Sequence, residues 1–190
     1  RNGEVMLEGV EVLEVDDADL EVAVNCAIQG SYYSTGQRCT ASSRFIVQKG
    51  IYPAFVAEMT RRLQALRVDD ALQAGTDIGP VVDQSQLDQN LRYVAIGQEE
   101  GAKLACGGSP LVRPKKGFYM APALFIDANN AMRIAREEIF GPVACAIPVE
   151  SYEEALQVSN DTEFGLSAGI CTTSLKYATH FKRHAQAGMV

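Results

Sequence analysis

With 190 residues, of which 47% are hydrophobic and 22% charged, the chain has the size and composition of one globular domain that can build its own core. The net charge of −7 argues against a nucleic acid partner, because neutralising phosphates requires clustered Lys and Arg. No apolar run is long enough for a membrane span, and no apolar signal-peptide core follows Arg1-Asn2-Gly3-Glu4.

Helical and strand-like patterns alternate along the first half of the chain. Asp16 and Asp17 precede Leu20, Val24 and Ile28, whose four-residue spacing predicts one face of a helix that these aspartates cap. The segments predicted in this half are, in order, a helix through 20–28, a loop over 34–40, a strand over 44–48, a helix that begins near Pro53, a loop over 69–80 and a helix through 87–94 that closes near Gly101.

The second half continues the alternation. Ser151 and Glu154 have the spacing of a capping box, in which each side chain bonds the other residue's backbone N–H. The predicted segments are, in order, a strand over 103–106, a turn over 107–110, an extended segment over 119–126 interrupted by Pro122, a short helix over 132–136, a strand over 143–149, a helix from 151, a strand over 166–171 and a helix over 174–183. Strands separated by helices indicate an α/β fold with a largely parallel sheet covered by helices on both faces.

The loop Gly36-Gln37-Arg38-Cys39-Thr40 offers the most specific chemistry. A cysteine attacks only as a thiolate, so its surroundings must supply a base or lower its pKa. Arg38 brings a positive charge next to Cys39, and residues 40–43 offer backbone and hydroxyl donors that could stabilise a thiolate or an oxyanion. From the residues alone, Cys39 is either a nucleophile or a small buried side chain.

The chain contains five cysteines, an odd number at wide spacing: Cys26, Cys39, Cys106, Cys145 and Cys171. There is no CxxC pair and no Cys/His cluster, which argues against a disulfide framework and against a metal site. Free thiols in a reducing cytoplasm are the simplest interpretation. The four cysteines other than Cys39 lie in apolar stretches and are expected to be structural.

Several segments in the right order resemble signatures of the aldehyde dehydrogenase superfamily. They are Gly36-Gln37-Arg38-Cys39-Thr40, Glu137-Glu138-Ile139-Phe140-Gly141-Pro142 and Asn160-Asp161-Thr162-Glu163-Phe164-Gly165-Leu166, supported by Asp16-Asp17-Ala18-Asp19-Leu20 and Gly75-Thr76-Asp77-Ile78-Gly79-Pro80. The resemblance runs from about residue 16 to residue 190. It implies that residues 1–190 are the catalytic domain of such an enzyme, with residues 1–14 atypical.

The resemblance implies that the enzyme oxidises an aldehyde to a carboxylic acid. Cys39 would attack the aldehyde carbon to give a thiohemiacetal, and its backbone N–H would help to hold the oxyanion. Loss of hydride to NAD or NADP would leave a thioester that water hydrolyses. In the second signature, Glu138 would contact the nicotinamide ribose and Phe140 would pack near the nicotinamide. Without the resemblance, Glu137 and Glu138 are more simply a solvated acidic turn.

Three features of the family have no match in this sequence. No GxGxxG or GxxxxGK[ST] motif is present, so the resemblance places the cofactor mainly in a domain absent from this chain, together with the oxyanion-hole asparagine. The general-base motif is also missing. Glu8 could be that base only if the alignment is shifted, and a surface carboxylate is the better interpretation. The family's C-terminal segment, which builds its homo-oligomer, is not present either. We therefore expect the isolated chain to have little dehydrogenase activity.

Arg38 bears on the substrate. A guanidinium suits a carboxylate, so Arg38 could bind an anionic group of the aldehyde, or it could equally face a protein carboxylate. The segments on either side of Cys39, 31–35 and 40–44, resemble the semialdehyde-acid branch, closest to 2-oxoglutarate semialdehyde dehydrogenases. A short semialdehyde that carries a carboxylate is the expected small-molecule partner.

Two alternatives from other classes stay open. A cysteine hydrolase, such as a thioesterase or amidase, needs a general base beside the thiol, and His180 and His184 are the only histidines. They lie one helical turn apart in a basic segment and are better explained as surface residues. The other alternative is a non-catalytic truncated module. Recovery of activity when the missing part of the enzyme is added would exclude this alternative.

Overall fold

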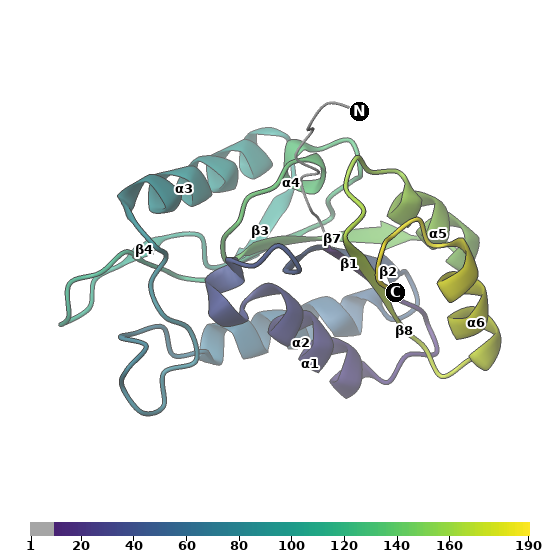
Figure 1. The fold of residues 1–190 in the computed structure, drawn as a ribbon, viewed down its shortest axis with the longest axis horizontal. Helices are drawn as coiled ribbons and strands as arrows, with labels where there is room; N and C mark the ends of the chain where they lie inside the picture. Colours follow the sequence, from purple (N-terminus) through teal and green to yellow (C-terminus); the bar gives the residue numbers. More distant parts are fainter. Residues whose placement is uncertain (1–9) are drawn as a thin grey trace.

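A computed structural model describes residues 10–190 as a six-stranded sheet with helices on both faces (Figure 1). Five strands run parallel, and β3 at one edge is antiparallel to its neighbour. In their spatial order the strands are β3 (Lys103–Cys106), β6 (Ala123–Ile126), β7 (Val143–Val149), β2 (Ser42–Gln48), β1 (Val10–Glu14) and β8 (Ser167–Cys171). The predicted α/β class with a largely parallel sheet is confirmed.

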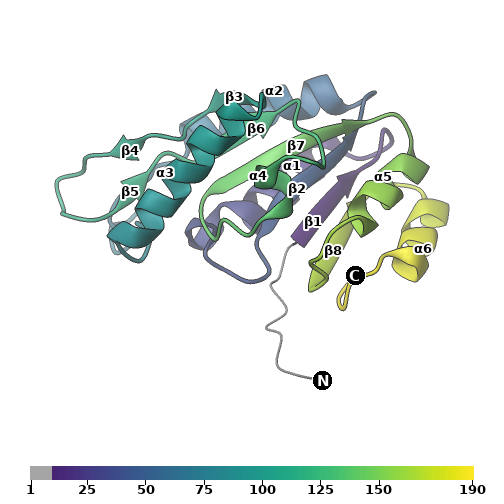
Figure 2. The same cartoon turned by 90° about the horizontal axis from the view of Figure 1, so that it is seen from above.

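The helices form one layer on each face of the sheet (Figure 2). One layer holds α1 (Leu20–Ser31) and α2 (Tyr52–Ala65), and the other holds α3 (Gln84–Glu99), α4 (Arg133–Arg136), α5 (Tyr152–Asn160) and α6 (Leu175–His184). A small hairpin-like pair, β4 (Pro110–Leu111) and β5 (Tyr119–Met120), lies apart from the main sheet. Among residues 10–190, no helix combines the length and apolar character that a bilayer span requires.

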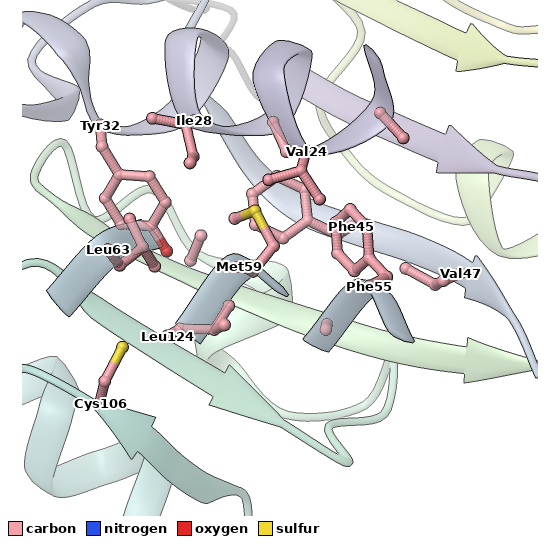
Figure 3. Close-up of a cluster of buried hydrophobic side chains, with 14 of the residues drawn as sticks. Val24, Ile28, Tyr32, Phe45, Val47, Phe55, Met59, Leu63, Cys106 and Leu124 are labelled. Carbon is pink, nitrogen blue, oxygen red and sulfur yellow. The ribbon is translucent and has the colours of Figure 1, made fainter. Parts of the chain in front are cut away.

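Side-chain alternation along β2 fills both layers, since successive residues of a strand point to opposite faces. Phe45 and Val47 pack against the α1–α2 layer, and Phe45 meets Phe55 edge to face at 5.8 Å between ring centroids (Figure 3). Ile46 points the other way and packs against the α5–α6 side. Arg44 points to that same side, as its hydrogen bond to Ser159 shows. The central strand is thus buried on both faces, as expected for a parallel sheet.

The structure departs from the predicted elements at the start of the chain. Val10–Glu14 form β1, an interior strand paired with both β2 and β8, where no strand was predicted. Glu8, the candidate general base, lies outside the described residues. Asp19, not Asp16 or Asp17, is the N-cap of α1 and accepts from Val22 N.

The capping box at α5 also differs from its prediction in one contact. Ser151 accepts from the backbone N–H of Glu154 as expected, but the Glu154 carboxylate accepts from Glu150 N, one residue earlier than predicted. The remaining helices and strands of the prediction are confirmed in type and order, and most of their ends agree to within about two residues. The exceptions are α1, which ends three residues later than predicted, and α3, which begins three residues before the predicted segment 87–94 and ends five residues after it.

Candidate active site

The loop that carries Cys39 leaves α1 through a left-handed turn. Ser34, Thr35 and Gly36 have φ values of 58°, 59° and 65°, which form the short 3₁₀ segment η1 (Tyr33–Gly36). A residue with a Cβ loses about 1–2 kcal/mol in this region of φ, so Ser34 and Thr35 adopt it only because the surroundings hold them there. The turn places Cys39 directly before β2.

Two side chains of the loop attach it to the segment that follows residue 75. The Thr35 hydroxyl donates to the Gly79 carbonyl at 3.3 Å. The Gln37 side-chain oxygen accepts from the backbone N–H of Val82 at 2.9 Å. The Gly75–Pro80 stretch of the sequence therefore has a structural role in fixing the strained turn before Cys39.

A narrow cleft is formed by the three segments singled out in the sequence, and within residues 10–190 its lining does not include Cys39 itself. Its lining includes Arg38, Ala41, Ser42, Glu138, Phe140 and Phe164. Cys39 itself is exposed, and its neighbours Arg38 and Ala41 reach the cleft. The cavity measures about 20 Å³, close to the space of one water molecule, so these residues form a wall rather than a complete binding pocket.

The other cysteines separate into accessible and buried thiols. Cys26 on α1 is exposed, Cys171 is half-buried, and Cys106 and Cys145 are buried. Burial raises the pKa of Cys145 to about 12 and also raises the pKa of Cys106. Neither of these two buried thiols is a candidate nucleophile at neutral pH, because the thiolate is the reactive form.

Arg38 makes a contact that neither sequence alternative anticipated. Its Nη2 donates to the carbonyl oxygens of Gln29 at 2.8 Å and Gly30 at 3.0 Å. These carbonyls lie in the last turn of α1, where backbone acceptors lack helical partners and carry partial negative charge. The guanidinium thus ties the residue before Cys39 to the end of α1, and Arg38 also lines the cleft.

The turn with Glu138 and Phe140 forms the facing wall. Phe140 has a positive φ of 57°, another strained position, and its ring is 38% exposed. The side-chain amides of Gln86 and Gln89 on α3 each donate to the Ile139 carbonyl at 3.0 Å. Two donors on one carbonyl hold the backbone just before Phe140 and keep its ring at the cleft.

Glu137 and Glu138 have different surroundings although they are adjacent. Glu137 accepts from Arg133 Nε at 2.8 Å and from the Tyr93 hydroxyl at 2.7 Å, and the Arg133 contact is the main cause of its lowered pKa. Glu138 lines the cleft with Phe140. Glu137 is therefore held in a half-exposed ion pair, whereas Glu138 lies at the cleft.

Sequence reasoning missed the contributions of Gln86, Gln89 and Phe164 to the site. The two glutamines lie on the polar side of a helix and looked like solvent-facing residues. Phe164 belongs to a segment that was recognised, but nothing in the sequence showed that its ring reaches the cleft. The roles of Gln86 and Gln89 follow only from the packing of α3 against the 139–141 backbone, and the role of Phe164 follows from its place in the lining of the cleft.

The histidines give no support to a hydrolase. His180 Nδ1 lies 2.9 Å from the Tyr152 hydroxyl, and His184 Nδ1 lies 2.7 Å from the His180 carbonyl. The two rings stack on α6, which packs on α5 and β8. Within the part of the chain that the structure describes, the lining of the cleft includes neither of them.

The carboxylate and the aromatic ring at the cleft are groups that could hold part of a nicotinamide cofactor. A carboxylate such as Glu138 is a suitable acceptor for ribose hydroxyls, and the exposed Phe140 ring offers an apolar surface for a heterocycle. The strain at Phe140, held by Gln86 and Gln89, is the kind of backbone cost that recurs at ligand sites. No phosphate-binding glycine motif accompanies these residues in the sequence.

Comparisons with known proteins identify a family and several relatives. Residues 10–190 match the family model described as "Aldehyde dehydrogenase family". The chain is 44% identical over 181 residues to an alpha-ketoglutaric semialdehyde dehydrogenase of Bacillus subtilis, an alignment that covers 94% of this chain and 37% of that protein. It is also 44% identical over 173 residues to a betaine aldehyde dehydrogenase of Cereibacter sphaeroides, covering 91% and 35% respectively.

Solved structures show the same likeness. HpcC from Thermus thermophilus superposes with a TM-score of 0.93 at 40% identity, over 97% of this chain and 37% of that one. A betaine aldehyde dehydrogenase from Staphylococcus aureus in complex with NAD⁺ superposes with a TM-score of 0.94 at 31% identity, over 97% and 37%. The chain thus spans little more than a third of the length of these proteins.

Proposed function

The chain belongs to the aldehyde dehydrogenase family, and on that premise we propose that it is the cysteine-bearing catalytic part of an NAD(P)-dependent enzyme that oxidises an aldehyde to a carboxylic acid. One observation carries the proposal. Cys39 is exposed on the loop before β2, and Arg38 and Ala41 of the same loop line a cleft whose facing wall holds Glu138 and Phe140. The loop of the proposed nucleophile and the proposed cofactor surface therefore share one cleft.

The proposed chemistry begins at Cys39. Its thiolate Sγ forms a bond to the aldehyde carbon, and the carbonyl oxygen takes up the negative charge as the thiohemiacetal forms. The backbone N–H of Cys39 is the donor that we assign to this oxyanion, because fixed donors stabilise developing charge most strongly. The nicotinamide, when bound, accepts the hydride. Hydrolysis of the resulting thioester at Cys39 then releases the acid and restores the thiol.

The residues assigned to the cofactor are Glu138 and Phe140. Glu138 is proposed to accept hydrogen bonds from the ribose, and Phe140 to pack beside the nicotinamide. The same residues would serve NAD or NADP, since the distinguishing phosphate is bound elsewhere. Glu8 is proposed as the general base, on the shifted alignment that brings it to the family's general-base position.

For the substrate we propose a short semialdehyde that carries a carboxylate. The Bacillus subtilis relative is named for such a compound, whereas other relatives are named for betaine aldehyde, which is cationic. Arg38 lines the cleft and favours an anion over a cation. Its Nη2 is engaged with α1, so any substrate contact must come from the rest of the guanidinium.

We place the enzyme in the cytoplasm as a homo-oligomer. Cys39 works only as a free thiol, which a reducing compartment preserves. The residue carrying the reaction is thereby protected from disulfide formation. Gel filtration of the complete enzyme with light scattering measures the number of subunits, and a monomeric active enzyme would contradict the oligomer.

The test uses the complete dehydrogenase that the proposal implies, with this chain as its catalytic part. NAD(P)H formation with a semialdehyde is followed by absorbance for the wild type, for Cys39→Ala and for Cys26→Ala. Cys26 is the matched control because it is also exposed but lies on α1. We expect Cys39→Ala to lose activity by more than about a thousandfold, as for removal of a nucleophile, and Cys26→Ala to keep it. Full activity in Cys39→Ala would rule the proposal out.

A further inference from the structure

Arg44 on β2 is a charged side chain in the interior of the protein. It is 2% exposed and lies opposite Cys145 of the neighbouring strand. Burial lowers the pKa of Arg44 to about 10, which leaves it charged at neutral pH. Burying a charge costs several kcal/mol unless hydrogen bonds compensate, so the partners of Arg44 show what it does.

The partners of Arg44 lie where α5 ends. Nη2 donates to the Ser159 carbonyl at 3.5 Å, in the last turn of the helix, and Nη1 donates to the Asn130 side-chain oxygen. Asn130 in turn donates to the carbonyl and the carboxylate of Asp161, at 2.9 and 2.8 Å. Asp161 is the C-cap of α5, so Arg44 and Asn130 together fix the end of this helix.

A second arginine, Arg136, reaches Asp161 from α4. Helix α4 lies on the same face of the sheet as α5 (Figure 2). Arg136 Nη1 lies 3.3 Å from Asp161 Oδ1. Arg136 is the last residue of α4 and is followed two residues later by Glu138. On the other side, Asp161 precedes Phe164 by three residues. The segments that carry Phe164 and the Glu138–Phe140 turn to the cleft therefore both leave from one ionic cluster around Asp161.

We propose that Arg44 is a positioning residue that sets the spacing between Phe164 and the Glu138–Phe140 turn. Arg44 acts through its hydrogen bond to Asn130, which in turn donates to Asp161. It lies five residues after Cys39 on the strand that the nucleophile loop enters, so the same side chain relates all three parts of the cleft. This inference rests on the proposed function, because only an active dehydrogenase makes that spacing a catalytic property.

The test compares Arg44→Met and Arg44→Lys in the complete dehydrogenase. Active sites are counted by alkylation of Cys39. The kcat is expressed per counted site, and the KM for the aldehyde is measured with the same protein. We expect Arg44→Met to raise KM by about tenfold and to lower kcat, since a shift of about 1 Å in a site can cost a hundredfold. Arg44→Lys should recover part of the loss, because an ammonium can still donate to one of the two acceptors.

Lys49→Met is the matched control, since Lys49 is a cation just beyond the same strand and pairs with exposed Glu150. It should leave KM unchanged. Asp161→Asn combined with Arg44→Met should be no worse than Arg44→Met alone, because both changes break one cluster. Should Arg44→Met fail to fold, Asn130→Ala removes the link to Asp161 and replaces it in the comparison.

The outcomes separate this inference from the proposed function. A purely structural role for Arg44 would reduce the number of counted sites and leave both KM and the kcat per counted site unchanged. That result would overturn the inference. A wild-type enzyme that forms no NAD(P)H from any aldehyde would instead overturn the proposed function. Additive effects of Arg44→Met and Asp161→Asn would also count against a shared cluster.

Discussion

The ideal Cβ position at Gly36 lies 2.2 Å from the carbonyl oxygen of Gly141, so these two glycines are in direct backbone contact. Gly36 belongs to the Cys39 loop, and Gly141 follows the turn with Glu138 and Phe140. A Cβ on Gly141 would in turn meet the buried Asn90 side chain at 2.3 Å. The Cys39 loop, the facing wall and α3 therefore stack without room for a methyl group, which fixes the width of the cleft.

Replacing Gly36 by Ala should destabilise the protein by more than about 3 kcal/mol, because backbone strain and a backbone clash add together. Gly101→Ala is the matched control. Gly101 also has a positive φ, of 94°, but nothing lies within 4 Å of its Cβ position, so only strain of about 1–2 kcal/mol is expected. Urea unfolding of both variants measures the difference. Equal losses would show that the contact between Gly36 and Gly141 is not tight.

Glu137→Gln and Glu138→Gln should separate structure from catalysis. Glu138→Gln is expected to raise the KM for the cofactor by about tenfold in the complete enzyme, because a charged acceptor is replaced by a neutral one. Glu137→Gln should leave that KM within about twofold. The comparison is made with steady-state kinetics and thermal melts of both proteins. An effect on KM from Glu137→Gln alone would reverse the assignment.

Glu137→Gln should also lower stability, by at most about 1 kcal/mol, in a pH-dependent way. Arg133 and Tyr93 lower the pKa of Glu137 in the folded state. A lowered folded-state pKa contributes stability above the unfolded pKa, near 4.3, and the contribution is lost as the pH falls through the folded value. The difference in unfolding free energy between wild type and Glu137→Gln should therefore shrink below about pH 4. A constant difference from pH 7 to pH 3 would show that the ion pair is not its origin.

Periodicity and turn residues predicted most of the fold, because amphipathic segments such as the one with Phe55 and Met59 show directly which side they bury. Strand β1 was not predicted because its place in the sheet depends on pairing with β2 and β8. Both of these strands lie far along the chain, so no local pattern shows the pairing. The N-cap was misplaced for a similar reason. Asp16 accepts from Ile51 N, a contact that no local pattern contains.

The same division holds for the site. Cys39, Glu138 and Phe140 stand in segments that a sequence can single out, and the structure brings those segments to one cleft. The contribution of Gln86 and Gln89 to the site could not be predicted, because both donate to the Ile139 carbonyl, at least fifty residues away in the sequence. The contact of Arg38 with the end of α1 likewise depends on the left-handed turn at 34–36, which the sequence shows only through Gly36.

The five thiols should differ in reactivity toward a brief, limiting pulse of iodoacetamide at pH 8. Cys39 and Cys26 are exposed and should react first, whereas Cys106 and Cys145 are buried. The pKa of Cys145, about 12, leaves a thiolate fraction on the order of one in ten thousand at this pH. Peptide mass spectrometry locates the label. Adding a semialdehyde substrate should protect Cys39 and leave Cys26 unchanged, and early labelling of Cys145 would contradict its burial.

Arg38→Leu tests whether the guanidinium binds the substrate or only the end of α1. If it binds an anionic substrate, the variant should raise KM about tenfold for a semialdehyde with a carboxylate and change it little for a neutral aldehyde of the same length. If Nη2 only caps the carbonyls of Gln29 and Gly30, both substrates should be affected equally, together with a loss of about 1 kcal/mol in stability. Kinetics with the matched pair of aldehydes decides between the two. We expect the selective change, because Arg38 lines the cleft as well as reaching the helix.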